Sequence, residues 1–561
     1  MCCYLCYDVK GIQQFIFSVP QLKYVVGGSL LIYEFDTVRV VQAARSAGLT
    51  GGAKIFSGGG RGTFKCESRE QAEHLRSYLV TAAMEIGLDL RIGMDEDLSQ
   101  AIHTADDLYP FIPESLEGEP CRVSGLWPTT LEDSKGYREE NRGVHKLIWE
   151  RRNRAIQRDE TGRNKADALS QNIVAGLKEL SSLPEDLRER ELIMLRAVRA
   201  DEEDEEELYE EAEAADESLG LRNRWAIVAM DGNDMGSQFR VFAQQDERQS
   251  HEHFERWMRA MSRSLEKCTR QAFLEALAEA VANWWDDSVV DGKRENAVTS
   301  DGRVVLPFRP LILGGDDVVC ICHVSYAVRF AETLARRFNE LSREEATRAK
   351  GEGIENLWPA TGNELTISAG IAFTGVTLPL YTSIRYADSL LASAKGRFRS
   401  EGGDGRPTPA AVDWENITES MLDTPAARRA RELRFLDGDL GGMEIVLTNR
   451  PYKMGDDLEA LHDLANRLQK EHKVPRSLLA EAVLQLRKPW AQRTRWLVSV
   501  AKHNRFLYEQ LNEIEDLDKK DDKKTSWSET EKEGKRVRTT RFVDAVSLLD
   551  ESHRMTQETV D

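Results

Sequence analysis

The pattern of apolar and polar positions repeats one order of elements twice along the chain. Residues 2–9 (CCYLCYDV) form a nearly continuous apolar run, which predicts a buried strand, and helical spacing follows as far as about Ala47. Residues 53–68 then hold two short strands around a glycine turn, and a helix runs from Glu70 to about Gly87. Strand, helices, hairpin and helix form the order of a ferredoxin-like palm.

The second occurrence lies in the middle of the chain. Residues 224–236 (RWAIVAMDGNDMG) predict a strand that ends in a polar turn, and a helical region covers about 240–285. Residues 304–324 hold two apolar strands joined by Gly-Gly-Asp-Asp, and a helix follows. A strand at 365–373 and a helix at 384–396 complete the set. Because the order of elements repeats with few shared residues, the sequence predicts two palms.

The remaining segments are mainly helical, so the expected fold class is α+β. A charged helical region separates the palms, and its acidic run at 201–217 reads as a solvated face or an excursion. The stretch 516–540 is dominated by charged residues and predicts a flexible loop. We predict four regions in chain order: a first palm (1–129), an inter-palm region (130–222), a second palm (223–415) and a C-terminal helical domain (416–561).

Composition narrows the class of substrate. The chain has 561 residues, too many for one core, and 76 basic against 96 acidic residues give a net charge of −20. Such a chain repels a nucleic-acid backbone, whereas a small polyphosphate can bind through metal ions and backbone N–H groups. No apolar run approaches the roughly 20 residues of a membrane span, and no secretory signal is apparent at the start. We therefore expect a cytoplasmic protein.

Three aspartates carry the strongest chemical signal. Asp231 ends one apolar strand of the second palm, and Asp316 and Asp317 lie in the turn between two others. In a palm sheet these strands are neighbours, so the three carboxylates converge and offer the hard oxygen ligands of two Mg²⁺ or Mn²⁺ ions. Two such metals activate a 3′-hydroxyl and neutralise charge on an α-phosphate and a leaving pyrophosphate. Gly314 and Gly315 permit a tight turn and a close backbone approach to a triphosphate.

A plain hairpin turn is the alternative for Gly-Gly-Asp-Asp. Asp231 at the end of a preceding strand, together with the apolar strands on either side of the turn, favours the metal site.

These motifs resemble the large polymerase-cyclase subunit of type III CRISPR effector complexes. The likeness runs from YDVKGIQQFIF and VVGGSLLIYEF through MDGNDMG, LILGGDD and ISAGIAF to ADSLLASAK. Members of this family carry two palms, and the second makes cyclic oligoadenylates from ATP. The resemblance implies that Asp231, Asp316 and Asp317 bind metal and that Lys395 binds the triphosphate. GGDEF diguanylate cyclases share the palm, but have Glu-Phe where this chain has Asp317-Val318, which favours the oligoadenylate branch.

Three polar residues near the aspartates are further candidates for nucleotide contacts. Asn233 and Asp234 either shape the turn after Asp231, as Asx turns do, or touch the ribose or base. Ser368 either faces the adenine or fills the sheet. Without the family resemblance, Lys395 would equally read as a surface lysine.

The first palm departs from the catalytic pattern. Asp8 matches Asp231, but the hairpin reads Ser57-Gly-Gly-Gly-Arg61-Gly62, without carboxylates, and Arg61 would oppose a metal. We therefore predict a catalytically inactive palm. Its glycine turn, together with Gly28 and Ser29, either approaches the acceptor nucleotide or only closes turns.

Two features common in the family have no counterpart in this sequence. Cys121 stands without a nearby cysteine partner, so we expect no zinc site between the palms. The first palm begins at residue 2, and His462-Asp463 lacks supporting histidines, so we expect no HD nuclease domain and no DNase activity.

Three functions remain in competition. The intact aspartates favour an enzyme of antiviral defence that converts ATP into cyclic or linear oligoadenylates. A non-catalytic scaffold that senses nucleotide or RNA within a CRISPR-type complex is the main alternative. The net charge disfavours a polymerase that extends a nucleic-acid primer. The implied partners are ATP, other subunits of an RNA-guided complex and target RNA, and the sequence leaves a homo-oligomer open.

Overall fold

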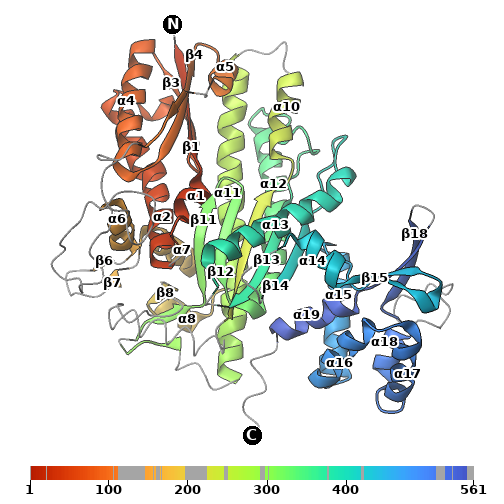
Figure 1. Ribbon diagram of the computed structural model, residues 1–561. Helices are drawn as coiled ribbons and strands as arrows, with labels where there is room; N and C mark the ends of the chain where they lie inside the picture. The colour runs from red at the N-terminus through yellow and green to blue at the C-terminus, as the bar shows by residue number, and fades with distance from the viewer. Residues whose placement is uncertain are drawn as a thin grey trace, which may run out of the picture.

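The computed structural model shows a chain built around two β-sheets with helices packed against them (Figure 1). The acidic run and Cys121 lie outside the described residues. The structure describes residues 2–19, 22–104, 107–111, 146–155, 157–158, 164–165, 167–195, 224–245, 251–290, 297–300, 302–375, 378–417, 423–512, 525–532 and 535–552.

The first sheet has the order β2-β3-β1-β4-β5, and all of its pairs are antiparallel. Its central strand β1 is the apolar run predicted from the sequence, and most of its side chains are buried. The hairpin of β2 and β3 encloses the glycine turn at Gly59 and Gly60, which both have positive φ. The strands are β1 (Cys3–Lys10), β2 (Lys54–Gly58), β3 (Arg61–Cys66), β4 (Asp89–Asp95) and β5 (Asp107–Tyr109).

Helices cover the first sheet in the predicted order. Among them, α4 begins after Ser68, whose side chain accepts a bond from the Gln71 N–H, and is followed by Gly87 in the left-handed conformation. The helical elements are α1 (Ile12–Ile16), α2 (Leu22–Glu34), a π-helical turn (Phe35–Arg39), α3 (Val40–Ser46), α4 (Arg69–Ile86) and α5 (Leu98–His103).

The second sheet has the order β11-β12-β9-β13-β14-β17. Strand β9 lies between β12 and β13 and pairs antiparallel with both. The register places Val318 opposite Met230 and Ser368 opposite Asp231, so β9 ends at the same edge as the β11–β12 turn. The strands are β9 (Arg224–Gly232), β11 (Phe308–Gly314), β12 (Asp317–Cys322), β13 (Ile367–Gly375), β14 (Ala411–Ile417) and β17 (Tyr452–Lys453).

Four helices accompany the second sheet: α10 (Met235–Gln245), α11 (His251–Val290), α12 (Ala327–Gly351) and α13 (Leu380–Phe398). The long helix α11 also contacts the first palm (Figure 1). Glu255 on α11 pairs with Lys65 of β3 at 2.7 Å, and Arg259 donates to the Gly52 carbonyl at 2.8 Å. Helix α11 therefore joins the two palms.

The region between the palms is helical where it is described, with α6 (Lys146–Ala155), α7 (Ala168–Glu179) and α8 (Glu185–Glu189). A short strand, β8 (Leu192–Met194), pairs in parallel with β10 (Val304–Leu306). These elements pack onto both palms, and the limits of the four predicted regions stay predictions.

The C-terminal region corrects one prediction. Part of the stretch expected to be a flexible loop forms a hairpin of β18 and β19, within a four-stranded sheet of order β15-β16-β19-β18. Its charged residues alternate and pair across strands: Arg538 on β19 bonds to Glu529 on β18 at 2.9 Å, while Trp527 and Val537 are buried. The strands are β15 (Arg434–Asp437), β16 (Met443–Val446), β18 (Trp527–Lys532) and β19 (Lys535–Thr540).

Helices make up the rest of that region: α14 (Pro425–Glu432), α15 (Asp456–Asn466), α16 (Arg476–Leu486), α17 (Trp490–Ala501), α18 (Arg505–Leu511) and α19 (Phe542–Ser552). Asp544 on α19 is fully buried and accepts bonds from the Thr448 hydroxyl, the Asn449 N–H and the Tyr452 hydroxyl, each at 2.7 Å. These bonds fasten α19 to the edge strand β17 of the second sheet.

The predicted α+β fold with two palms and helical regions is confirmed. None of the helices within the described ranges has the length and apolar character needed to cross a bilayer.

Candidate active site

The three aspartates meet at one edge of the second sheet. Asp231 is the penultimate residue of β9, and Asp317 opens β12, the neighbouring strand. Gly314 pairs with Asp317 to close the hairpin, and Gly315 adopts a φ of 60°, which glycine accepts without steric cost. The convergence predicted from the order of strands is therefore present.

The carboxylates lie close enough for the charge of Asp231 to raise the pKa of Asp316 and of Asp317. Desolvation and the negative charge of Asp231 raise the pKa of Asp316 to about 7. Desolvation near the turn, with the charges of Asp316 and Asp231, raises the pKa of Asp317 to about 8, although this residue as a whole is exposed. Carboxylates held against their mutual repulsion favour a bound cation, because a cation removes that repulsion.

Gly232 makes room for this arrangement. A Cβ on Gly232 would lie 2.9 Å from both the Cβ and Oδ2 of Asp316, and 3.1 Å from Met235. Such contacts are too short for an unshifted structure. A side chain at this position would therefore displace Asp316.

Lys395 reaches the same edge from the last turn of α13. Its Nζ donates to the Asp231 carboxylate and to the Gly232 carbonyl, the latter at 2.8 Å. The Lys395 side chain is only 18% exposed, so its ammonium lies within the site. The sequence placed this lysine beside the aspartates only through the family resemblance.

The donor set suits a hard divalent cation. Carboxylate oxygens of Asp231, Asp316 and Asp317, with the backbone carbonyl of Gly232, are the ligand types that Mg²⁺ and Mn²⁺ prefer. Within the described residues, no three His, Cys, Asp or Glu side chains already converge as tightly as a bound ion requires. The ligand atoms are of the type that Mg²⁺ or Mn²⁺ prefers, but the three carboxylates must move closer to one another to bind an ion.

Two glycine turns meet beside the aspartates. A Cβ on Gly314 would lie 3.4 Å from the Cα of Gly59 in the first palm. From the other side, Thr269 on α11 donates its hydroxyl to the Gly315 carbonyl at 2.6 Å. The turn that carries Asp316 is therefore held between the first palm and α11.

The matching edge of the first palm has different chemistry. Asp8 accepts a bond from Arg61 at 3.0 Å and pairs with Lys10. Two cations thus offset the charge of the aspartate that corresponds to Asp231. The glycine turn is held by Asp36, whose carboxylate accepts a bond from the Gly60 N–H at 2.7 Å.

Residues 224–401 match the family model of the Cas10/Cmr2 second palm domain. This span contains all three aspartates, both glycines of the turn and Lys395. Residues 224–401 therefore form a palm domain of the Cas10/Cmr2 type. The family predicted from the motifs is thereby confirmed.

Solved structures of Csm1–Csm4 resemble the fold of this chain. A Csm1–Csm4 cassette in complex with cA4 matches with a TM-score of 0.47 and 14% identity, covering 91% of this chain and 66% of that chain. The cassette in complex with one ATP gives a TM-score of 0.46, with the same identity and coverage. The Csm1–Csm4 subcomplex of the type III-A CRISPR-Csm interference complex gives 0.46 at 15% identity, again covering 91% and 66%.

The chain thus spans slightly less than two thirds, 66%, of the length of these relatives, and identity this low concerns the fold alone. No curated protein sequence matches the chain.

Two predicted contacts of the Cas10/Cmr2 palm need correction. Asn233 and Ser368 are 3% and 0% exposed, and the Ser368 hydroxyl donates to the Asn233 side-chain oxygen at 3.1 Å. Asn233 also donates to the Thr366 hydroxyl at 2.9 Å, and Ser368 accepts a bond from the Ala411 N–H. Both side chains point into the sheet and its flanking loop, so they support the end of β9 rather than face a nucleotide.

Asp234 also supports the end of β9. It adopts a φ of 61° and accepts bonds from the N–H and the hydroxyl of Thr408, at 2.7 and 3.0 Å. Of the two roles that the sequence left open, the structure favours a turn-forming one.

Gly28 and Ser29 are also corrected. They lie inside helix α2 and are buried, so their backbone neither closes a turn nor faces a nucleotide. A Cβ on Gly28 would lie 3.2 Å from the Cα of Ile16, and Ser29 donates to the Leu311 carbonyl of β11. These small residues allow α2 to pack closely against α1 and the second sheet.

Sequence reasoning missed two residues near the site. Thr269 lies 46 residues before the turn that it contacts, and no local pattern marks it. Asp388 lies on α13 two turns before Lys395, and desolvation together with the Asp231 charge raises its pKa to about 6. Its spacing of seven residues from Lys395 on one helix face was a signal that could have identified it.

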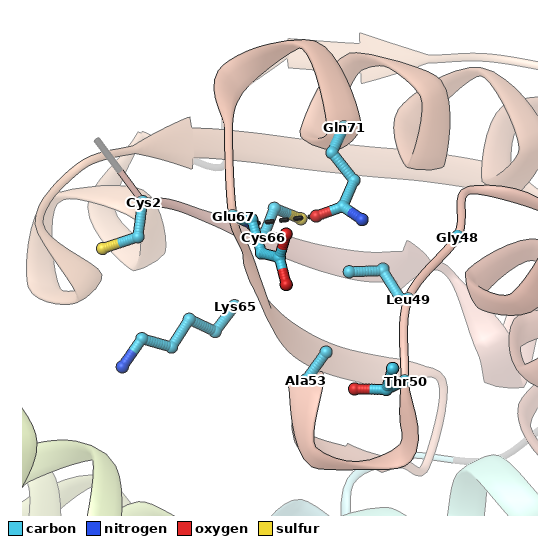
Figure 2. A pocket seen from close by; sticks show the side chains of 9 residues that line it. All are labelled: Cys2, Gly48, Leu49, Thr50, Ala53, Lys65, Cys66, Glu67 and Gln71. Atoms are coloured by element: carbon cyan, nitrogen blue, oxygen red, sulfur yellow. Dashed lines mark hydrogen bonds between the residues drawn. The ribbon is translucent and has the colours of Figure 1, made fainter.

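A hollow in the first palm lies away from these residues (Figure 2). Lys65 reaches from its rim toward Glu255 of α11, and the exposed Cys2 borders it. None of the predicted site residues lines the hollow. Its lining consists of Cys2, Gly48, Leu49, Thr50, Ala53, Lys65, Cys66, Glu67 and Gln71.

Proposed function

We propose that this chain is a nucleotidyltransferase that joins ATP into cyclic or linear oligoadenylates. The convergence of Asp231, Asp316 and Asp317 beside Lys395 carries the proposal. The family model supports the type of palm, and the geometry supplies the groups that phosphoryl transfer needs.

The three carboxylates would hold two divalent cations, with Mg²⁺ or Mn²⁺ as the proposed cofactor. When bound, such ions lower the pKa of an attacking hydroxyl and stabilise negative charge on the transferred phosphate. The chain's own contribution is to position these ligands on a turn that Thr269 and the first palm hold in place. Lys395 would contact the phosphates of the donor nucleotide, where an ammonium offsets the charge of the departing pyrophosphate.

The acceptor nucleotide would lie toward the first palm. The Gly59 turn adjoins Gly314, and its lack of side chains leaves backbone exposed next to the aspartates. A nucleotide bound there would present its 3′-hydroxyl to the α-phosphate of the donor. Holding both nucleotides in one site makes the reaction effectively unimolecular.

We also propose that the chain acts in antiviral defence as the cyclase subunit of a type III CRISPR complex. The Cas10/Cmr2 type of the second palm supports this context. The proposed partners are the other subunits of such a complex and a target RNA.

Incubation of the purified chain with labelled ATP and Mg²⁺ or Mn²⁺, without template or primer, tests the activity. We expect oligoadenylates from the wild type and none from Asp316→Ala with Asp317→Ala. The matched control is Asp456→Ala with Asp457→Ala, another adjacent aspartate pair that is exposed at the start of α15. Nucleotide binding without any product, alone or with partner subunits, would instead indicate a sensing scaffold.

A further inference from the structure

We propose that Lys395 is an internal counterion that occupies the cation position of the aspartate site, and that a metal ion binds only as Lys395 leaves. The inference rests on the proposed role of Asp231, Asp316 and Asp317 as metal ligands. It adds that metal and nucleotide bind together, because the nucleotide phosphates draw the Lys395 ammonium away from Asp231.

The contacts of Lys395 are those of a bound cation. Its Nζ donates hydrogen bonds to two oxygens from consecutive residues, a carboxylate oxygen of Asp231 and the backbone carbonyl oxygen of Gly232. A carboxylate and an adjacent backbone carbonyl at a strand end are also the oxygens that a divalent ion would use here. An ammonium and a divalent cation repel each other strongly at such short range, so both cannot occupy this pair.

The position of Lys395 on α13 allows it to move. The residue lies in the last turn of the helix. Its four-carbon stem carries a compact charge that can rotate without moving the backbone. Helix α13 itself packs on β9, β13 and β14, so the side chain, and not the helix, is the moving part.

Charge balance gives the exchange its direction. In the ligand-free site, the Lys395 ammonium pairs with the Asp231 carboxylate and offsets part of the negative charge of the three neighbouring aspartates. A nucleotide triphosphate with its metal offers anions to Lys395 and a stronger cation to the carboxylates. Each ligand therefore makes room for the other, and their binding free energies are coupled reciprocally.

If Lys395 only bound the nucleotide phosphates, its removal would affect metal binding differently. Its removal would weaken nucleotide binding and leave metal binding without nucleotide unchanged. A counterion predicts that its removal strengthens metal binding without nucleotide, because the competitor is gone.

Titration of the full chain with Mn²⁺, without nucleotide and followed by electron paramagnetic resonance, separates the two. We expect Lys395→Met to bind Mn²⁺ at least about tenfold more tightly than the wild type, a change of about 1.4 kcal/mol. Lys453→Met is the matched control: it removes one positive charge from β17 of the same sheet, where Lys453 pairs with Glu401 at 2.6 Å. Lys395→Arg keeps a cation and should bind Mn²⁺ like the wild type.

A second arm adds a non-hydrolysable ATP analogue. The wild-type affinity for Mn²⁺ should rise several-fold more than that of Lys395→Met, because only the wild type has a competitor to lose. Lys395→Gln repeats the test with a different neutral side chain and must show the same gain, and Asp231→Asn with Lys395→Met should abolish it.

The outcomes distinguish the two proposals. If Lys395→Met and Lys395→Gln bind Mn²⁺ no more tightly than Lys453→Met, the counterion role is overturned while the metal site stands. If the wild type with the analogue and both Lys395 variants all fail to bind Mn²⁺, the proposed function is overturned as well.

Discussion

Gly314 of the second palm and Gly59 of the first lie in direct contact, since a Cβ on Gly314 would stand 3.4 Å from the Cα of Gly59. The turn that carries Asp316 and Asp317 is therefore also part of the interface between the palms. The first palm lacks carboxylates at its own hairpin and pairs Asp8 with Arg61. Through Gly59, the first palm packs against the turn of the second palm and helps to hold it in place.

Exchange of one aspartate in each palm should separate their roles. We expect Asp231→Asn to lower the rate of oligoadenylate synthesis by on the order of 100-fold or more, because it removes a ligand charge at the reacting phosphate. Asp8→Asn should change the rate by less than about threefold, because the ion pairs that Asp8 makes within the described part of the chain are with Arg61 and Lys10 of its own palm. Steady-state synthesis from labelled ATP measures both, and similar losses would show that the first palm takes part in the chemistry.

Gly232→Ala should disable the site while leaving the fold intact. The new Cβ would press on Asp316, and misplacement of a catalytic group by about 1 Å can cost on the order of 100-fold in rate. Gly236→Ala is the control, because a Cβ there meets nothing within 4 Å. Activity and thermal unfolding of both variants should be measured together. A fully active Gly232→Ala would mean that Asp316 tolerates displacement and does not hold a metal.

Thr269→Val should slow turnover more than it affects binding of ATP. The variant loses the hydroxyl bond to the Gly315 carbonyl, which frees the turn beside Asp316, so we expect kcat to fall about tenfold with KM little changed. Ser264→Ala, five residues earlier on the same helix, loses a bond of 2.9 Å to Glu345 instead of one to the turn, and serves as the control. If both variants lower stability and kcat equally, Thr269 has no role beyond packing.

Stability without metal should depend on pH through Asp316. Its pKa is raised from 3.8 to about 7 in the folded protein, so the folded state binds more protons than the unfolded state between these values. The contribution of Asp316 to stability therefore falls as pH rises from about 4 to 7.

Asp316→Asn removes this penalty. In a chelator, the variant should exceed the wild type in free energy of unfolding by more than about 1 kcal/mol at pH 8 and match it near pH 4. The exposed Asp463 offers a control, since Asp463→Asn should show no such trend. A difference that is the same at both pH values would contradict the raised pKa.

The sequence was sufficient to predict the two palms and the three aspartates. Long apolar strands separated by glycine turns fix the element order, and the order fixes which strand ends meet. Side-chain direction was beyond its reach: Asn233 and Ser368 flank Asp231 in sequence or register, yet both turn into the interior. Position along the strand does not show which side chains the flanking loop will cover.

Two other errors have simple physical causes. Gly28 and Ser29 were predicted either to approach the acceptor nucleotide or to close a turn, because small residues serve both loops and close helix packing. Only the neighbours of α2 decide between these roles. The stretch 516–540 was predicted to be a loop because of its many charged residues, and the sequence does not show which of these residues pair with one another. Pairs such as Glu529 with Arg538 form only once two strands lie side by side.

The topology of the C-terminal sheet sets an order of events on the ribosome. Strand β16 pairs in parallel with β19, and α15, α16, α17 and α18 are all made between them. The β15–β16 hairpin therefore emerges with one edge unpaired and waits for a distant strand, a delay that exposes it to wrong partners. Helix α19 follows at once and brings Asp544 to the edge of the second sheet. The second palm thus receives its final fastening only when nearly all of the described chain has been translated.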